Sequence, residues 1–147
     1  MTQLSMNFSL NELTASQEAT RHNINNTPSA AVVENLRMLA ALLEQIRTLL
    51  GDRSIHISSG YRSLALNRYI GSRDLSAHVR GYAADFTCTA FGKPIEVAKK
   101  IAESNLKFDQ LIYEGTWVHI SCDPQNRRQL LTARFEHGHT YYTTGIA

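Results

Sequence analysis

The sequence contains little cysteine. Its 147 residues include only two, Cys88 and Cys122. Two isolated cysteines cannot build the disulfide framework of a small secreted domain, and neither belongs to a CxxC pair. We therefore expect both to be buried thiols.

Strong charge of one sign and long apolar runs are also absent. Lysine and arginine number 15, and aspartate and glutamate 13, which leaves a net charge of +2 at pH 7. This charge is too small and too scattered to indicate nucleic-acid binding. No stretch approaches the roughly 18 apolar residues of a membrane span. The start, MTQLSMNFSL, lacks the basic and apolar regions of a signal peptide, so we expect synthesis in the cytoplasm.

The length predicts one domain over residues 1–147, and 43% of the residues are hydrophobic, which is enough for a core. The clearest helix lies in NTPSAAVVENLRMLAALLEQIRTLLG, with Thr27 as its cap, Pro28 at its first position and Gly51 at its exit. One face of this helix carries apolar residues at three- and four-residue steps: Val32, Leu36, Leu39, Leu43, Ile46 and Leu50.

Shorter patterns predict the other elements. We expect strands in SIHIS, residues 54–58, and in GYAADFTCTAF, and helices in LALNRYIG, ending at Gly71, and in PIEVAKKIAESN. Two further stretches predict hairpins, turning at Gly115-Thr116 and near Gly138. Together these elements predict an α+β fold, with a small antiparallel sheet and helices packed on one side.

The stretch SAHVRGYAADF places His78 and Asp85 seven residues apart. This spacing fits neither one face of a helix nor one face of a strand. Gly81 and Ala83 leave room for a loop to pass into a strand, so Asp85 could turn back toward His78. A histidine nitrogen and a carboxylate oxygen are both good zinc ligands.

A third ligand is available in WVHIS. In a strand, Trp117, His119 and Ser121 share one face. Two histidines and one aspartate would leave the fourth tetrahedral position to water, as in catalytic zinc sites. On the residues alone, a zinc site and a set of unrelated side chains both stay open as interpretations.

The remaining histidines are expected outside this group. His22 and His56 have no partner motif and are interpreted as surface or hydrogen-bonded residues. His137 and His139 have a spacing found in metal sites, but Gly138 between them favours the tip of a hairpin.

Strand parity orients the two cysteines. Cys88 lies three residues after Asp85, and Cys122 lies three residues after His119. In regular strands both thiols therefore point to the face opposite the candidate ligands. There the two thiols could approach one another.

These motifs resemble a known family. Five residues fit the pattern S-x-H-x-x-G-x-A-x-D: Ser76, His78, Gly81, Ala83 and Asp85. With a later W-x-H on a strand, this pattern is similar to the zinc D-alanyl-D-alanine carboxypeptidase family. Its members include bacterial carboxypeptidases and bacteriophage endolysins, and the Hedgehog signalling domain shares its fold and zinc site. SGYRS, at residues 59–63, and FSLNELTASQEATRHNINNTP, which resembles the compact phage-associated branch, extend the resemblance from about Phe8 to Cys122.

The resemblance implies a role for each matching residue. His78, Asp85 and His119 would bind Zn²⁺. Arg62 would hold a substrate carboxylate or the developing oxyanion, because its guanidinium donates two parallel hydrogen bonds. Ser76 would brace the loop or a ligand.

The general base is less directly implied. Many relatives have an acidic residue three positions before the last histidine, where this sequence has Thr116. A carboxylate is still needed to collect a proton and pass it to the leaving amine. Glu114, five positions before His119, is the favoured base, and Asp109 is the alternative.

The implied function is zinc-dependent hydrolysis of peptide bonds in peptidoglycan stem peptides or cross-links, next to D-alanine. The enzyme would be a D-Ala-D-Ala carboxypeptidase or an endopeptidase of phage or prophage origin. It would act as a monomer, without nucleic-acid or membrane partners, on the cell wall after release or as part of a virion. One alternative is a non-catalytic zinc-binding virion structural or wall-binding protein of the same fold, and a weaker one is a metal-free regulatory domain.

Overall fold

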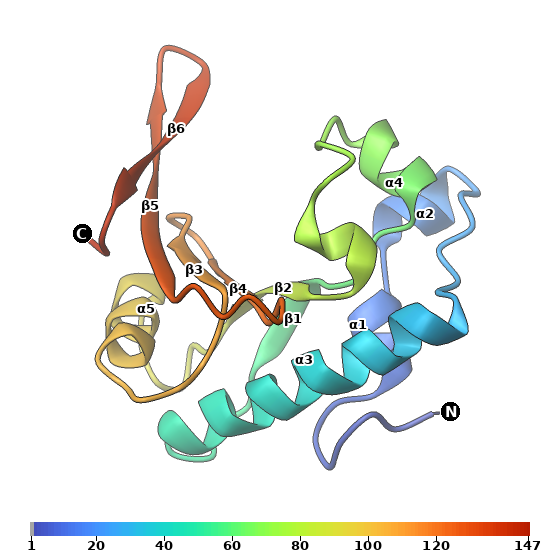
Figure 1. Cartoon of the computed structure of the whole chain (residues 1–147). Helices are drawn as coiled ribbons and strands as arrows, with labels where there is room; N and C mark the ends of the chain where they lie inside the picture. Colours follow the sequence, from blue (N-terminus) through green and yellow to red (C-terminus); the bar gives the residue numbers. More distant parts are fainter. Residues whose placement is uncertain (1) are drawn as a thin grey trace.

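The structure is a computed structural model that describes residues 2–147, shown in Figure 1. Its elements are, in order, α1 (Leu10–Thr14), α2 (Gln17–Arg21), α3 (Ala30–Leu49), β1 (His56–Ser59), α4 (Leu64–Tyr69), the 3₁₀ helix η1 (Ala77–Arg80), β2 (Ala83–Thr87), α5 (Pro94–Ala102), β3 (Gln110–Tyr113), β4 (Val118–Ser121), β5 (Gln129–Glu136) and β6 (His139–Thr144).

The six strands form one sheet in the order β1-β2-β4-β3-β5-β6, so the expected α+β fold is confirmed. The β3–β5 pair is parallel, and the other four pairs are antiparallel. The expectation of a wholly antiparallel sheet is therefore wrong at one pair. The reason is topological: after β4 the chain passes the start of β3 and places β5 on its far side, which makes β5 run in the direction of β3.

Helix α3 is the predicted long helix, but it begins later than expected. Its N-cap is Ser29, whose hydroxyl accepts a hydrogen bond from the Val32 N–H at 3.3 Å. The predictions of Thr27 as the cap and Pro28 at the first helical position are wrong, because the helix begins at Ala30 and uses Ser29, the stronger capping residue, beside its first turn. Gly51 takes a φ of +82° just after the helix, as expected of a left-handed exit.

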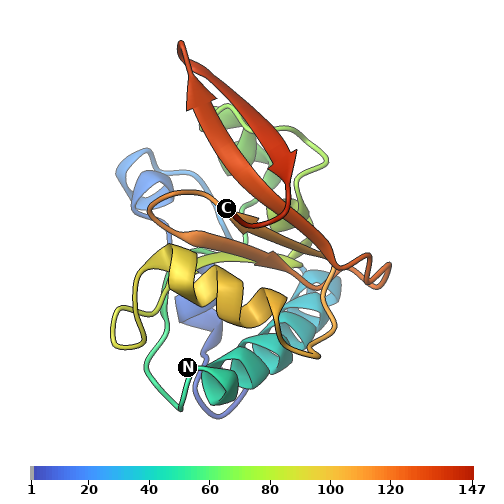
Figure 2. The same cartoon turned by 90° about the vertical axis from the view of Figure 1, so that its left-hand side faces the viewer.

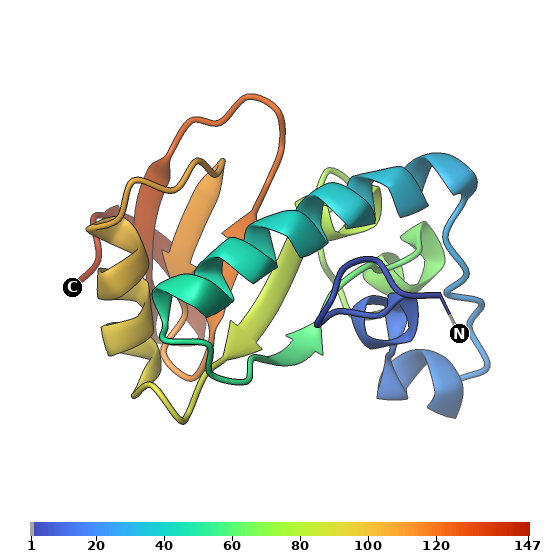
Figure 3. The ribbon, with the colours of Figure 1, turned by 90° about the horizontal axis from the view of Figure 1, so that it is seen from below.

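The core lies between one face of the sheet and helices α3 and α5, which Figure 3 shows from their own side. Every second residue of the central strands points into it, including Ala84 and Phe86 of β2 and Ile120 of β4. Cys88 and Cys122 belong to the same core, which confirms two buried thiols on the face opposite Asp85 and His119. Helix α4 and η1 lie on the other side of the sheet (Figure 1), so the expectation of helices packed on one side is wrong for these two, because η1 brings His78 onto the open face beside Asp85.

Strands β5 and β6 form a long hairpin that projects from the sheet in Figures 1 and 2. Glu136 pairs with His139, so the turn contains only His137 and Gly138. Both turn residues have positive φ, +49° and +76°, as a type I′ hairpin turn requires. The hairpin predicted near Gly138 is thus confirmed, as is the hairpin of β3 and β4. Across residues 2–147, no helix combines the length and apolar character that crossing a bilayer needs.

Candidate metal centre

The 3₁₀ helix η1 presents His78 to the open face of the sheet. Ser76 caps η1: its hydroxyl accepts a hydrogen bond from the His78 N–H at 3.3 Å. Gly81 then ends η1 at a φ of +78°, which turns the chain back into β2. His78 and Asp85 are therefore joined by a tight reversal, which explains why their spacing matched no regular element.

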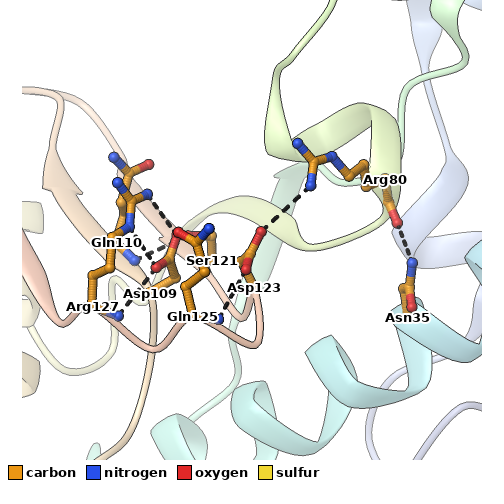
Figure 4. Close-up of polar contacts among 8 residues, drawn as sticks. All are labelled: Asn35, Arg80, Asp109, Gln110, Ser121, Asp123, Gln125 and Arg127. Atoms are coloured by element: carbon orange, nitrogen blue, oxygen red, sulfur yellow. Dashed lines mark hydrogen bonds and ion pairs between the residues drawn. The ribbon is translucent and has the colours of Figure 1, made fainter.

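Contacts on both sides hold η1 in place. The Arg80 guanidinium lies 3.6 Å from the Asp123 carboxylate, and the Arg80 carbonyl accepts a hydrogen bond from Asn35 of α3 at 2.9 Å (Figure 4). A Cβ atom on Gly81 would lie 2.9 Å from a Val32 methyl group. The close approach to α3 and the positive φ both require glycine at this position.

The pairing of β2 with β4 brings the other two candidate ligands together. Asp85 and His119 are direct partners in this antiparallel pair, so their side chains lie on the same face. Asp85 Oδ1 is 2.9 Å from His119 Nδ1 and 3.4 Å from His78 Nε2. One ligand atom from each of the three residues lies within 4.8 Å of the other two.

The burial of the two histidines and the tautomer of His78 suit these residues to binding a cation. His78 and His119 are only 3% and 8% exposed. His78 Nδ1 lies 2.7 Å from the Gly60 carbonyl oxygen, which can only accept, so Nδ1 carries the proton and Nε2 presents its lone pair. Such a bond from the second ring nitrogen is the usual support of a metal-binding histidine.

The charge states favour a cation as well. Burial lowers the pKa of His78, which keeps this ring neutral at pH 7. Burial alone would raise the pKa of Asp85, but the hydrogen bonds and electrostatic attraction of the His78 and His119 rings outweigh it and hold that pKa well below its usual range. A neutral imidazole and an ionised carboxylate are the forms that bind metals. The three donors fit a zinc ion with one position left for solvent or substrate.

Arg62 lies beside this group. Its backbone N–H donates to the His78 carbonyl at 3.1 Å. Burial lowers the pKa of Arg62, while the charges of Asp85 and Glu114 raise it, so the guanidinium is close to both carboxylates. Among residues 2–147 the Arg62 Nε atom has no hydrogen-bond partner although it is buried. An unpaired buried donor costs about 1–3 kcal/mol, and a bound acceptor would satisfy it.

Glu114 stands at the end of β3, where the chain turns toward β4. Glu114 Oε2 lies 4.0 Å from His119 Nδ1. Burial raises the pKa of Glu114, and the negative charge of Asp85 raises it further. The carboxylate is thus close to the candidate ligands and ready to take up a proton. Thr116, where many relatives have the acidic residue, lies in the turn itself.

Asp109, the alternative base, has a different environment. Its carboxylate accepts two hydrogen bonds from Arg127, each 2.8 Å long, in a side-by-side pair (Figure 4). These bonds lower the pKa of Asp109. The structure therefore places Glu114 near the histidines and commits Asp109 to a salt bridge.

The other histidines lie outside the group. His137 and His139 are exposed at the tip of the β5–β6 hairpin, and His56 is exposed on β1. His22 stacks on Tyr69, with ring centroids 4.5 Å apart. Within the described residues, the group of His78, Asp85 and His119 is the arrangement that could hold a metal ion.

A cavity of about 500 Å³ adjoins Arg62. Strand β1 and the segment of residues 15–18 form two of its walls, and Tyr61, Leu66 and Ile70 line another side. Ser59, in its β1 wall, pairs directly with Asp85 of β2, so the cavity lies along the strand next to the candidate ligands. The sequence has no signal for this cavity because its walls come from separate segments.

Comparison with known proteins agrees with this arrangement. A search of curated proteins found no match. A family model described as Peptidase M15 matches residues 6–121, which is most of the chain and spans every candidate residue from Arg62 to His119. This family comprises zinc-dependent, D-Ala-D-Ala carboxypeptidase-like peptidases of peptidoglycan. The chain therefore belongs to the peptidase M15 family and is a metallopeptidase.

Proposed function

We propose that this metallopeptidase cuts peptide bonds next to D-alanine in peptidoglycan stem peptides or cross-links, as a D-Ala-D-Ala carboxypeptidase or endopeptidase. The observation that supports this most is the convergence of two histidines and an aspartate within 4.8 Å, with a proton acceptor and an unpaired cationic donor beside them. Membership of the M15 family supports the substrate class.

Three side chains would hold the metal through atoms that already face one another: His78 Nε2, Asp85 Oδ1 and His119 Nδ1. A zinc ion bound there would polarise the substrate carbonyl and lower the pKa of water to about 7. Gly60 would keep the His78 ring in the required tautomer through its carbonyl oxygen.

Glu114 would move the proton. A carboxylate with a raised pKa can accept the proton of the attacking water and then donate it to the leaving amine nitrogen. Both transfers occur at the carboxylate oxygen that faces His119. The partial burial of Glu114 limits competition from bulk solvent for this proton.

Arg62 would bind negative charge on the substrate. Its guanidinium can donate two parallel hydrogen bonds to a terminal carboxylate, or one bond to the oxyanion that develops at the scissile carbonyl. A carboxypeptidase needs the contact with the terminal carboxylate, whereas an endopeptidase uses only the contact with the oxyanion. The cavity beside Arg62 offers room for the residue that carries the carboxylate.

The proposed setting is a phage or prophage product that acts as a monomer on the cell wall, after release from the cytoplasm or as part of a virion. The similarity of residues 8–28 to the phage-associated branch supports this setting. We propose that the protein acts on peptidoglycan without a nucleic-acid or membrane partner.

The test is digestion of purified peptidoglycan by the wild-type protein and by Glu114→Ala, with released fragments identified by mass spectrometry. Release of single D-alanine residues by the wild type alone would indicate a carboxypeptidase, and loss of cross-linked dimers would indicate an endopeptidase. Zero release by both zinc-loaded proteins would contradict the proposal and favour the non-catalytic virion or wall-binding alternative. Retention of no zinc after mild purification would favour a metal-free domain.

A further inference from the structure

The β5–β6 hairpin continues the open face of the sheet that carries the metal centre. In the β4–β3 pair His119 lies directly opposite Ile112, and in the β3–β5 pair Ile112 lies opposite Leu131. Directly paired residues point to the same face of a sheet. Leu131 of β5 therefore lies on the face of His119, and so does every second residue after it.

The same parity places Tyr142 on this face. Ala133 follows Leu131 by two residues and pairs directly with Tyr142 of β6. The neighbouring Tyr141 pairs with Arg134 and points to the opposite face. The two adjacent tyrosines thus differ in orientation: Tyr142 faces the side of the metal centre, and Tyr141 faces away.

The hairpin also approaches the turn next to Glu114. It rises on the side of the sheet where η1 and α4 lie, opposite helices α3 and α5 (Figure 1). Phe135, on the face of Tyr142, comes within 4.0 Å of the position that a Cβ atom would take on Gly115, in the turn next to Glu114. The hairpin therefore lies against the turn that carries the candidate base.

The charges of the candidate site bear on Tyr142. Burial raises the pKa of Tyr142, and the carboxylates of Glu114 and Asp85 raise it further, whereas Arg73 lowers it. The side chain nevertheless keeps 52% of its surface exposed. Its phenol is thus a protonated donor on the sheet face of the candidate ligands, open to a bound molecule.

We propose that Tyr142 is a substrate-binding residue of this metallopeptidase site, where it donates a hydrogen bond from its phenol to a carbonyl oxygen of the bound peptide. This inference rests on the proposed function for the identity of the peptide. Arg62, which precedes α4, and Tyr142, on the hairpin, would contact the peptide from two separate parts of the chain. The family model ends at Ser121, so the hairpin is a contribution outside the matched region.

The test compares Tyr142→Phe with Tyr141→Phe, a matched control that removes the same hydroxyl from the opposite face of the same strand. The probe is a synthetic stem pentapeptide ending in D-Ala-D-Ala, or a purified cross-linked muropeptide dimer if the wild type cuts only cross-links. Loss of one neutral hydrogen bond should lower kcat/KM by roughly three- to tenfold in Tyr142→Phe. Most of this effect should be in KM, and Tyr141→Phe should stay within twofold of the wild type.

A binding measurement separates this inference from the proposed function. The dissociation constant of the same probe is measured by calorimetry for zinc-loaded wild type, Tyr142→Phe and Tyr141→Phe, with zinc content and thermal unfolding checked for each. Weaker binding by Tyr142→Phe alone supports the inference even if the wild type hydrolyses nothing. Equal KM, kcat and dissociation constants in all three proteins, or no binding by any of them, would overturn it. Tyr142→Ala, which also removes the ring, should weaken binding further than Tyr142→Phe.

Discussion

The two ends of strand β3 carry carboxylates in opposite environments. Asp109, just before the strand, is held by the Arg127 guanidinium, and its pKa is lowered. Glu114, just after the strand, is partly buried near Asp85, and its pKa is raised. Both residues precede His119 and both are acidic, so the sequence offers both as bases, with Glu114 favoured and Asp109 as the alternative. The comparison teaches that a carboxylate held by two charge-assisted hydrogen bonds stabilises the fold, whereas one without such a side-by-side pair is available for proton transfer.

Metal removal should have the largest effect on activity and the smallest on the role of Asp109, so it separates Glu114 from Asp109 most clearly. The activity of the wild type should fall to background in a chelator and return on addition of Zn²⁺, because the proposed mechanism uses a metal ion next to Glu114. Thermal unfolding should shift by the same amount in wild type and in Asp109→Asn, since Asp109 does not contact the candidate ligands. Activity that survives complete zinc removal, verified by elemental analysis, would contradict the metallopeptidase mechanism.

Substitution of Glu114 should give the next largest effect. Glu114→Gln should reduce kcat by roughly 10²- to 10⁴-fold, because the amide cannot accept and return the proton. The free energy of unfolding should change little, since the substitution keeps the volume and removes a partly buried charge. The measurements are turnover on a stem peptide and urea-induced unfolding. A kcat within tenfold of the wild type would remove Glu114 from the mechanism.

Substitution of Asp109 should have the reverse profile. Asp109→Asn should lower the free energy of unfolding by about 1–3 kcal/mol, because the amide carries no charge and can accept only one of the two hydrogen bonds that Arg127 donates. Activity per folded molecule should stay within about twofold of the wild type. If the variant were as stable as the wild type but inactive, the roles assigned to the two carboxylates would have to be exchanged.

The pH dependence should give the smallest effect. Because the pKa of Asp109 is lower in the folded protein than in the unfolded chain, its contribution to stability is complete above the unfolded value of about 4 and disappears as the pH falls through the folded value. The difference in unfolding free energy between wild type and Asp109→Asn should therefore be constant from about pH 8 to pH 5 and narrow below pH 4. Urea unfolding at a series of pH values measures it. A difference that instead grew on acidification would rule out the salt bridge as its source.

Local chemistry allowed much of the fold to be predicted. The apolar periodicity identified α3, and turn residues identified both hairpins, because these signals depend on residues near one another in the chain. The start of α3 was predicted wrongly, since Thr27 and Ser29 are both capping residues and only the fold selects one. The parallel β3–β5 pair was missed because strand neighbours are chosen by the packing of the whole sheet.

The site divides in the same way. Strand parity placed His119 and motif resemblance placed His78 and Asp85, and the structure brings all three together. The sequence favoured Glu114 but left Asp109 open as the base, because the partner that holds Asp109 is Arg127, 18 residues away. No sequence pattern indicated Tyr142, because its position on this face depends on the order of strands β4, β3, β5 and β6.

By itself, the sequence determined which segments form helices and hairpins, that the cysteines are buried, and which three residues are candidate ligands. These properties follow from residue type and short-range spacing. The tertiary structure alone decided which carboxylate forms no side-by-side salt bridge, where a cavity opens beside Arg62, and that a tyrosine of the last strand lies on the sheet face of the candidate metal ligands. Such properties depend on which distant segments lie together, and the electrostatic environment of a side chain is the sum of those neighbours.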